Sequence, residues 1–268
     1  MEHAMRIIDL DEQNVPLYLV CLEDWSEEVK ESGNRKTIWY QRMKDKGLRV
    51  KLALDDNGVV GGMIQYVPIQ YSFAEGADLY IINCIWVHGH KQGRGDFRRR
   101  GMGKALLAAA ETDARALGAK GMVAWGLLIP VFMRASWFRK QGYKYADRMG
   151  MMSMLWKPFS ADAVAPKWIR PTGNPLPLAK NKVTVTTLCN GWCPAQNVAM
   201  ERARRAAADP QFAGNVVVRD IDTFDRTNFM RWGISDALYV NKKQVRTGPP
   251  PSYEKIHKLI AKQVSRLG

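Results

Sequence analysis

The turn between residues 79–87 and residues 105–117 constrains the fold of this chain more than any other feature of the sequence. The first segment, LYIINCIWV, is apolar and rich in β-branched side chains, which predicts a buried strand. The second is alanine-rich, ends at Gly118 and is predicted to form a helix. Between them, residues 96–104 read DFRRRGMGK. The chain should therefore contain a mixed α/β domain in which a buried strand leads through a basic, glycine-containing turn into a helix.

This turn has the chemistry of a site for the phosphates of a small ligand. The first N–H groups of a helix lack partners within it, and with the helix dipole they favour bound anions. Gly101 and Gly103 have no Cβ, so the backbone can approach a phosphate closely. The arginines at 98–100 and Lys104 add positive charge, and the spacing Arg-x-x-Gly-x-Gly suits a diphosphate wrapped by one turn.

Other interpretations of the turn fit the residues less well. A Rossmann dinucleotide site needs a third glycine in a parallel βαβ unit and an acidic residue about 20 positions later. The Walker A spacing is missing from the sequence. A surface for nucleic acid would interleave aromatic side chains with the arginines, and this segment does not. A basic helix start that binds nothing stays as an alternative.

Length and composition favour a globular protein with two domains. The chain has 268 residues, of which 46% are hydrophobic and 25% charged. Its net charge of +14 would suit nucleic acid, an anionic membrane or a polyanionic cofactor, but the basic residues are spread over the whole chain. We find neither an apolar run of membrane-spanning length nor a secretory signal. We therefore expect a cytoplasmic protein that binds no membrane and no nucleic acid.

The predicted elements divide the chain at a proline-rich stretch. The first domain, residues 1–157, should contain a strand at 5–9, helices at 15–22 and 35–46, a hairpin over 50–69, and strands and helices alternating from 79 to a last strand at 149–157. The hairpin turn at Asn57-Gly58 predicts type I′ geometry, with positive φ at both central residues. Residues 158–181 contain five prolines and are predicted to be a linker. The second, smaller α/β domain, residues 182–268, should contain strands at 182–188 and 215–221, a helix at 194–208, a hairpin at 237–247 and a helix at 253–266.

Residues 79–145 resemble the core of the GNAT N-acetyltransferase superfamily. The resemblance rests on the strand IINCIWV, the turn RRRGMG, the helix KALLAAAETDARALGA, the strand MVAWGLL and the helix in ASWFRKQGYKY, which ends in a Gly-aromatic pair. With the upstream helices and hairpin it covers about residues 5–157. It implies the acyl-CoA N-acyltransferase fold, acetyl-CoA as acyl donor, and direct attack by a primary amine of a small molecule or peptide.

The resemblance also implies which residues hold acetyl-CoA. Amides of the turn would bind the pyrophosphate, and the basic side chains would neutralise its charge. The strand end near Trp86 and Val87 would pair with the pantetheine arm and polarise the thioester carbonyl. The implied cofactor-binding residues are Trp86, Val87, Arg98, Arg99, Arg100, Gly101, Met102, Gly103 and Lys104.

Two positions depart from the catalytic pattern of the superfamily. Phe138 replaces the usual tyrosine acid four residues before the Gly-aromatic pair, and Val131 replaces an asparagine commonly found seven residues earlier. Because phenylalanine donates no proton, either another acid acts or the thiolate leaves unaided. The candidates for proton transfer are His88 as a general base, with Ser136, Tyr143, Tyr145 and Cys84 as further groups. His88 and His90 could instead be ordinary loop histidines, and we expect no metal site there.

A pair of cysteines, Cys189 and Cys193, stands where a predicted strand meets a helix start, a position that lowers the pKa of a thiol. The sequence WCPAQ aligns Cys193 with the nucleophilic cysteine of thioredoxin-like folds, and residues 232–260 resemble their second half. The whole chain is similar to GNAT acetyltransferases with a thioredoxin-like, YoaP-like, C-terminal domain. However, Gln196 occupies the usual resolving position, and Ser235-Asp236 replaces the usual cis-proline. A redox switch, a thiol carrier, capture of a soft metal and a structural role all stay open.

The sequence thus predicts an N-acetyltransferase with a GNAT domain, a linker and a thioredoxin-like domain. One alternative is a thiol-handling protein that acts through the cysteine pair while the first domain binds CoA. Two others are a nucleic-acid-binding module that uses the net charge of +14 and a CoA-binding protein without turnover. The acetyl acceptor and the oligomeric state cannot be derived from these residues.

Overall fold

The computed structural model describes residues 5–129, 132–172, 176 and 178–267, and these residues form two compact units. The first unit comprises Met1–Trp25 and Arg42–Ile169, and the second comprises Ser26–Gln41 and Arg170–Gly268. An early segment of the chain therefore packs with the C-terminal residues. Among the described residues, no helix is both long and apolar enough to cross a membrane.

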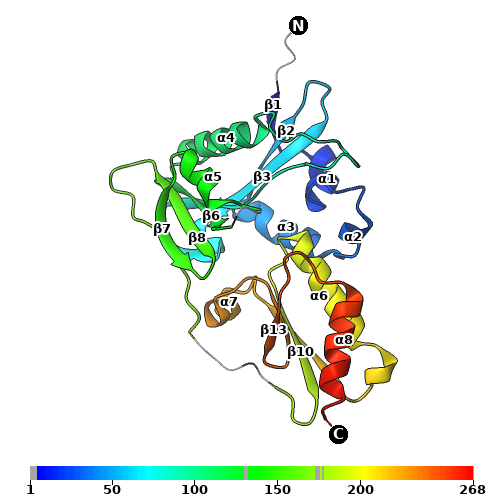
Figure 1. Cartoon of the computed structure of the whole chain (residues 1–268). Coiled ribbons are helices and arrows are strands. Elements are labelled where there is room, and N and C mark those ends of the chain that lie inside the picture. The colour runs from blue at the N-terminus through cyan, green and yellow to red at the C-terminus, as the bar shows by residue number, and fades with distance from the viewer. Residues whose placement is uncertain (1–4, 130–131, 173–175, 177, 268) are drawn as a thin grey trace. The chain divides into compact units, whose positions relative to one another are not determined.

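The first unit is built on a seven-stranded sheet in the order β1-β2-β3-β5-β6-β8-β7 (Figure 1). Of its strand pairs only β5 with β6 is parallel, and the others are antiparallel. The strands are β1 (Arg6–Asp9), β2 (Arg49–Leu54), β3 (Val60–Pro68), β5 (Leu79–Val87), β6 (Gly121–Leu127), β7 (Lys144–Met149) and β8 (Met152–Pro158).

Helix α4 (Met102–Ala116) packs on this sheet and supplies the centre of its core. Its buried residues, among them Leu106 and Ala110, contact Ile64 and Ile82 of the sheet in one apolar cluster. Helices α1 (Val15–Leu19) and α5 (Ala135–Lys140) and the short turns η1 (Glu12–Asn14), η2 (Lys44–Lys46) and η3 (Ile69–Tyr71) complete the unit. The helix after the basic turn is thus confirmed and begins three residues earlier than expected.

Several local predictions for the first unit need correction. The hairpin between β2 and β3 is present, but only Gly58 of the Asn57-Gly58 pair has positive φ, because Asp55 accepts the N–H groups of Asn57 and Val59 and shapes the turn. The strand expected at 149–157 is β8, which begins three residues later than expected. Strand β7 was not predicted, and it folds back onto β8 through a turn at Gly150 with φ +58°.

Residues 158–169 of the expected linker belong to the first unit. There β9 (Lys167–Trp168) pairs with β4 (Ala74–Glu75), and the Trp168 ring stacks on Phe73 with centroids 5.4 Å apart. Proline content indicated a flexible connection, but burial of the Trp168 side chain holds this part of the chain in place.

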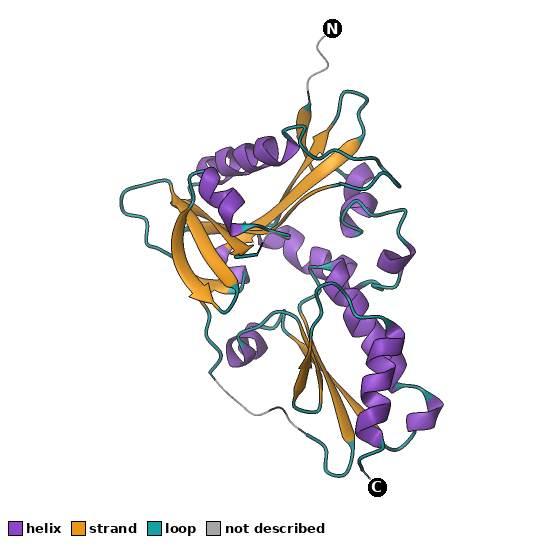
Figure 2. Cartoon of the chain, in the orientation of Figure 1, coloured by secondary structure: helices purple, strands orange, loops and turns teal. Residues whose placement is uncertain are grey.

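The second unit contains a four-stranded sheet in the order β11-β10-β12-β13. Strand β10 (Val183–Cys189) lies parallel to β11 (Val216–Asp222) and antiparallel to β12 (Ala237–Val240), which pairs with β13 (Lys243–Val245). Helices α6 (Pro194–Ala207) and α8 (Tyr253–Val264) lie side by side on one face, and α7 (Arg226–Trp232) lies on the other (Figure 2). Another short turn, η4 (Pro210–Phe212), follows α6. The expected strands, hairpin and helices are confirmed, whereas α7 was not predicted.

Ion pairs join the early segment of the second unit to α6. This segment holds α2 (Glu27–Lys30) and most of α3 (Arg35–Met43). The guanidinium group of Arg202 donates to Glu31 at 2.6 Å and to Glu28 at 3.0 Å, and Arg205 also bonds Glu31. Because Arg202 is 9% exposed, its charge depends on these carboxylates.

Candidate functional site

The basic turn forms an open concave backbone at the start of α4. Gly101 is the N-cap residue and has φ +86°, and Arg99 also has positive φ, +63°. Alternation of left-handed and right-handed residues turns successive N–H groups toward one side, which creates an anion-binding concavity. In the described part of the chain, a Cβ built at Gly101 would meet no atom within 4 Å, so the space in front of the turn is open.

The helix start leaves donors for an anion. Lys104 and Ala105 donate their N–H groups to the carbonyl of Gly101, and the two preceding N–H groups of the helix have no acceptor within it. Met102 differs from the other residues of the turn because its side chain is buried in the core. Gly103 lies against Trp137 and Val87 at ordinary van der Waals distance. The backbone of the turn therefore offers N–H donors to an anion, and the diphosphate expected there stays a prediction.

The cationic side chains of the turn differ in whether a carboxylate already pairs with them. Arg98 forms a two-pronged ion pair with Asp96 and covers Gly89, where a Cβ would meet its side chain at 2.5 Å. Arg100 lies over the Phe97 ring at 5.2 Å. Arg99, Arg100 and Lys104 are exposed, and within the described residues no carboxylate pairs with them. These three can neutralise a ligand, whereas the charge of Arg98 is already compensated.

Strands β5 and β6 separate beside this turn. They pair in parallel from Leu79 with Gly121 to Ile82 with Ala124, and the pairing ends there. Asn83 is the extra residue of a bulge in β5, and its carbonyl accepts the indole N–H of Trp125 at 2.9 Å. Beyond the bulge, the last residues of β5 face β3 on one edge only. The separation leaves backbone donors and acceptors of β5 available to an extended ligand.

Trp86 and Val87 lie in this last part of β5. Trp86 is opposite Met63 of β3, and Val87 is opposite Gly62. Val87 packs toward α4, so alternation along the strand directs Trp86 to the other face of the sheet. The Trp86 indole N–H is buried without an acceptor among the described residues. Both residues therefore lie at the end of β5 as predicted, whereas their contact with a pantetheine arm stays a prediction.

His88 is held by two hydrogen bonds that fix its tautomer. Its Nε2 accepts from the indole N–H of Trp25 at 2.9 Å, so Nδ1 carries the proton and donates to the Gly95 carbonyl at 2.6 Å. The side chain is fully buried. As a general base, His88 would have to break its bond to Trp25; that role stays a prediction.

The two ends of the loop after His88 are held together by backbone contacts. An isolated bridge joins Gly89 to Asp96, and the N–H of Phe97 donates to the His88 carbonyl at 2.9 Å. The Phe97 ring then packs on Gly61. These contacts fix the position at which the loop ends and the basic turn begins, although the loop is long.

The remaining proton-transfer candidates lie in different environments. Tyr143 is buried, which raises the pKa of its hydroxyl well above the usual range. Cys84 is also buried, whereas Ser136 is exposed at the start of α5. Phe138 is fully buried between Trp137 and Tyr143, so its ring is part of the hydrophobic core. Val131 lies outside the described residues.

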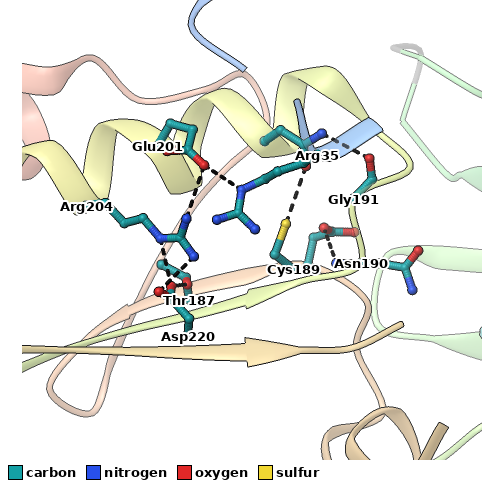
Figure 3. Close-up of polar contacts among 10 residues, drawn as sticks. Arg35, Thr187, Cys189, Asn190, Gly191, Glu201, Arg204 and Asp220 are labelled. Atoms are coloured by element: carbon teal, nitrogen blue, oxygen red, sulfur yellow. Dashed lines mark hydrogen bonds and ion pairs between the residues drawn. The ribbon is translucent and has the colours of Figure 1, made fainter. Parts of the chain in front are cut away.

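The cysteine pair lies in the second unit, where Cys189 ends β10 (Figure 3) and Cys193 precedes the first residue of α6. Both residues are thiols, with Cys189 buried and Cys193 half-buried as the N-cap of the helix. The Cys189 thiol donates to the side-chain carbonyl of Asn197 at 3.4 Å. Burial and the nearby carboxyl group of Asp236 raise the pKa of Cys189 to about 12, although the guanidinium group of Arg35 opposes this. Cys189 is therefore a protonated thiol at neutral pH.

Arg35 connects this thiol to a chain of charges. Its Nε donates to Glu201 at 2.5 Å, and Glu201 also pairs with Arg204 at 3.3 Å (Figure 3). Arg204 in turn binds Asp220 at 2.7 Å on β11. Sequence analysis missed Arg35, which is far from the cysteines in the chain, and named Asp236 only as part of the pair that replaces the usual cis-proline.

A family model and several solved structures are similar to this chain. Residues 15–143 match the family model for the acetyltransferase (GNAT) family. No curated protein matches the chain. Three solved structures are similar to parts of it. PaiA N-acetyltransferase from Thermoplasma acidophilum with coenzyme A is 18% identical, covering 58% of this chain and 99% of that one, with a TM-score of 0.43.

The other two structures give similar values. A GNAT family acetyltransferase from Brucella melitensis with acetyl-CoA is 20% identical, covering 61% of this chain and 94% of that one, with a TM-score of 0.41. The GNAT family N-acetyltransferase YhbS from Escherichia coli with CoA is 12% identical, covering 61% of this chain and 89% of that one, with a TM-score of 0.43.

Proposed function

The chain carries a GNAT-family acetyltransferase domain, and from this premise we propose that it transfers an acetyl group from acetyl-CoA to a primary amine. The observation that carries the proposal is the start of α4. There a left-handed Gly101 with open space in front of it follows the end of a strand that has separated from its parallel neighbour. A diphosphate at the turn and an extended arm along β5 would place a thioester near Trp86.

In this account the backbone carries most of the binding. Amides of residues 99–104 hold the pyrophosphate, and Arg99, Arg100 and Lys104 neutralise it. Acetyl-CoA supplies an activated acetyl thioester. Backbone N–H groups at the end of β5 stabilise negative charge on the carbonyl oxygen, and the acceptor reaches it as a neutral amine, since an ammonium group has no lone pair.

We propose that transfer needs no dedicated side-chain acid. Phe138 donates no proton, and Tyr143 and Cys84 are buried in the protein. The C–N bond forms as the C–S bond breaks, and the attacking nitrogen releases its extra proton to solvent. A thiol has an ordinary pKa of about 8.5, so a thiolate is a stable leaving group near neutral pH and solvent can protonate it. Ser136 and Tyr145 are the exposed members of the candidate set, and on this proposal Ser136→Ala and Tyr145→Phe should each retain turnover.

The test has two parts. Calorimetric titration measures binding of acetyl-CoA to the full chain, and release of thiol across a panel of amines, with mass spectrometry of the products, measures transfer. Binding together with an N-acetylated product supports the proposal. Binding without transfer to any amine would leave a CoA-binding protein and refute the enzyme.

For the second unit we propose a thioredoxin-like domain. Support comes from its strand order β11-β10-β12-β13, from the parallel pair β10 and β11 joined through α6, and from Cys193 at the N-cap of α6. A thiol function of this unit is the second candidate, favoured by the exposure of Cys193 relative to Cys189. Alkylation followed by mass spectrometry should modify Cys193 well before Cys189, and equal rates would contradict a thiol function.

A further inference from the structure

We propose that the acetyl acceptor is a primary amine carried on an aromatic or other flat apolar body, which binds against a wall of ring side chains at the end of β5. We define this aromatic wall as Trp25, Trp86, His90, Trp125 and Phe132. The inference rests on the proposed function, because it names the acceptor class for the same site.

The aromatic wall is a continuous set of ring contacts. Phe132 lies between the two separated strands, with its centroid 5.9 Å from Trp86 of β5 and 6.0 Å from Trp125 of β6. His90 continues the row, 6.4 Å from Trp86 and 5.7 Å from Trp25. All five residues belong to the first unit.

These rings are not fully buried, as rings of a core would be. Phe132 is 38% exposed, His90 is exposed, and the three tryptophans are half-buried. Large apolar side chains gathered in this way on a surface usually mark a binding site. Edge-to-face and tilted arrangements leave ring faces that a further aromatic group can pack against.

The wall lies where the acceptor must arrive. Trp86 precedes Val87 on the part of β5 assigned to the thioester, and it projects from the sheet face opposite α4. Its buried indole N–H has no acceptor among the described residues, so a bound molecule can supply one. An acceptor lying on Trp86 and Phe132 would bring its amine beside the reacting carbonyl.

Charge near the wall argues against a polycationic acceptor. Asp24, next to Trp25, is paired with Arg94 at 3.2 Å. Asp96, on the loop that follows His90, is paired with Arg98 at 2.6 Å. Because both carboxylates are paired with arginines and the chain carries a net charge of +14, neither offers an unpaired countercharge to a polyamine. An acceptor with a single amine on an aromatic body would instead pack its ring against the rings of the aromatic wall.

The test measures equilibrium binding, so that it does not depend on turnover. The full chain is saturated with CoA and titrated calorimetrically with tryptamine, butylamine and spermidine, for the wild type and for Phe132→Leu. The matched control is Tyr71→Leu, which removes an exposed aromatic ring of the same unit outside the wall. Thiol release from acetyl-CoA is followed separately.

We expect tryptamine to bind at least about tenfold more tightly than spermidine or butylamine. Phe132→Leu should weaken tryptamine about three- to tenfold and leave butylamine within about twofold, whereas Tyr71→Leu should change neither. Spermidine binding as tightly as tryptamine would overturn the proposal, and so would unchanged tryptamine affinity in Phe132→Leu. Selective binding without thiol release would support the aromatic wall and refute the transferase function instead.

Discussion

Arg98 binds both carboxylate oxygens of Asp96, with its Nε 2.9 Å from Oδ1 and its Nη2 2.6 Å from Oδ2. Because of this pair, we expect the first arginine of the basic turn to act as a counterion for the carboxylate of Asp96 rather than as a direct phosphate ligand. The bond to Arg98 lowers the pKa of Asp96, so the carboxylate keeps its negative charge throughout the neutral range.

The ion pair leads to a prediction for acetyl-CoA affinity. Arg98→Ala should weaken binding about five- to tenfold, because the uncompensated carboxylate of Asp96 repels the pyrophosphate. The double variant Asp96→Asn/Arg98→Ala should recover most of the affinity. Calorimetric titration checks both, and a double variant as weak as the single one would mean that Arg98 contacts the ligand itself.

Replacement of Phe138 should affect stability more than chemistry. Its ring is fully buried, so Phe138→Ala should lower the free energy of unfolding by about 3–5 kcal/mol, as measured by denaturant titration. The milder Phe138→Leu should stay folded and retain turnover, because no proton donor is lost. A folded Phe138→Leu protein without any transfer would show that this ring shapes the site.

Asp236 gives a prediction with a defined pH dependence. Burial raises the pKa of its carboxyl group from 3.8 to about 6, outweighing hydrogen bonds that favour the charged form. The folded state therefore binds the proton more tightly than the unfolded state. The protonated carboxyl group of Asp236 adds to the free energy of unfolding below pH 4, and this contribution is lost as the pH rises through 6.

Asp236→Asn should therefore stabilise the second unit by about 3 kcal/mol at pH 7.5 and have little effect below pH 4. Hydrogen exchange of β10 amides in the full chain measures this local stability. Asp209→Asn is a contrasting control, since backbone hydrogen bonding from Gln211 lowers the pKa of Asp209, and its replacement should destabilise at pH 7.5. Equal effects of Asp236→Asn at both pH values would contradict the assignment.

Local patterns predicted much of this molecule. The apolar run of β5, the basic turn and α4 depend on neighbouring residues, and each is found where the sequence indicated. The same holds for α6 with Cys193 at its start. The turn at Gly150 was missed because β7 and β8 pair through tertiary contacts that a single apolar run does not reveal.

The contacts that define the sites come from distant parts of the chain. Arg35 reaches Cys189 only because the early segment packs on α6, and the bond between Trp25 and His88 joins a loop to a strand end. The position of Phe132 between Trp86 and Trp125 depends on the bulge that separates β5 from β6. No periodicity or motif in the sequence encodes these relationships.

The most direct measurement of the central claim is acetyl-CoA affinity in Gly101→Glu, compared with Gly118→Glu. Both glycines have positive φ, +86° and +80°, and both have open space at the Cβ position in the described structure, so the backbone strain is matched. They lie at opposite ends of α4. We predict that Gly101→Glu abolishes measurable binding by placing a carboxylate in the phosphate site, while Gly118→Glu binds like the wild type. Equal affinity of the two variants would contradict the account.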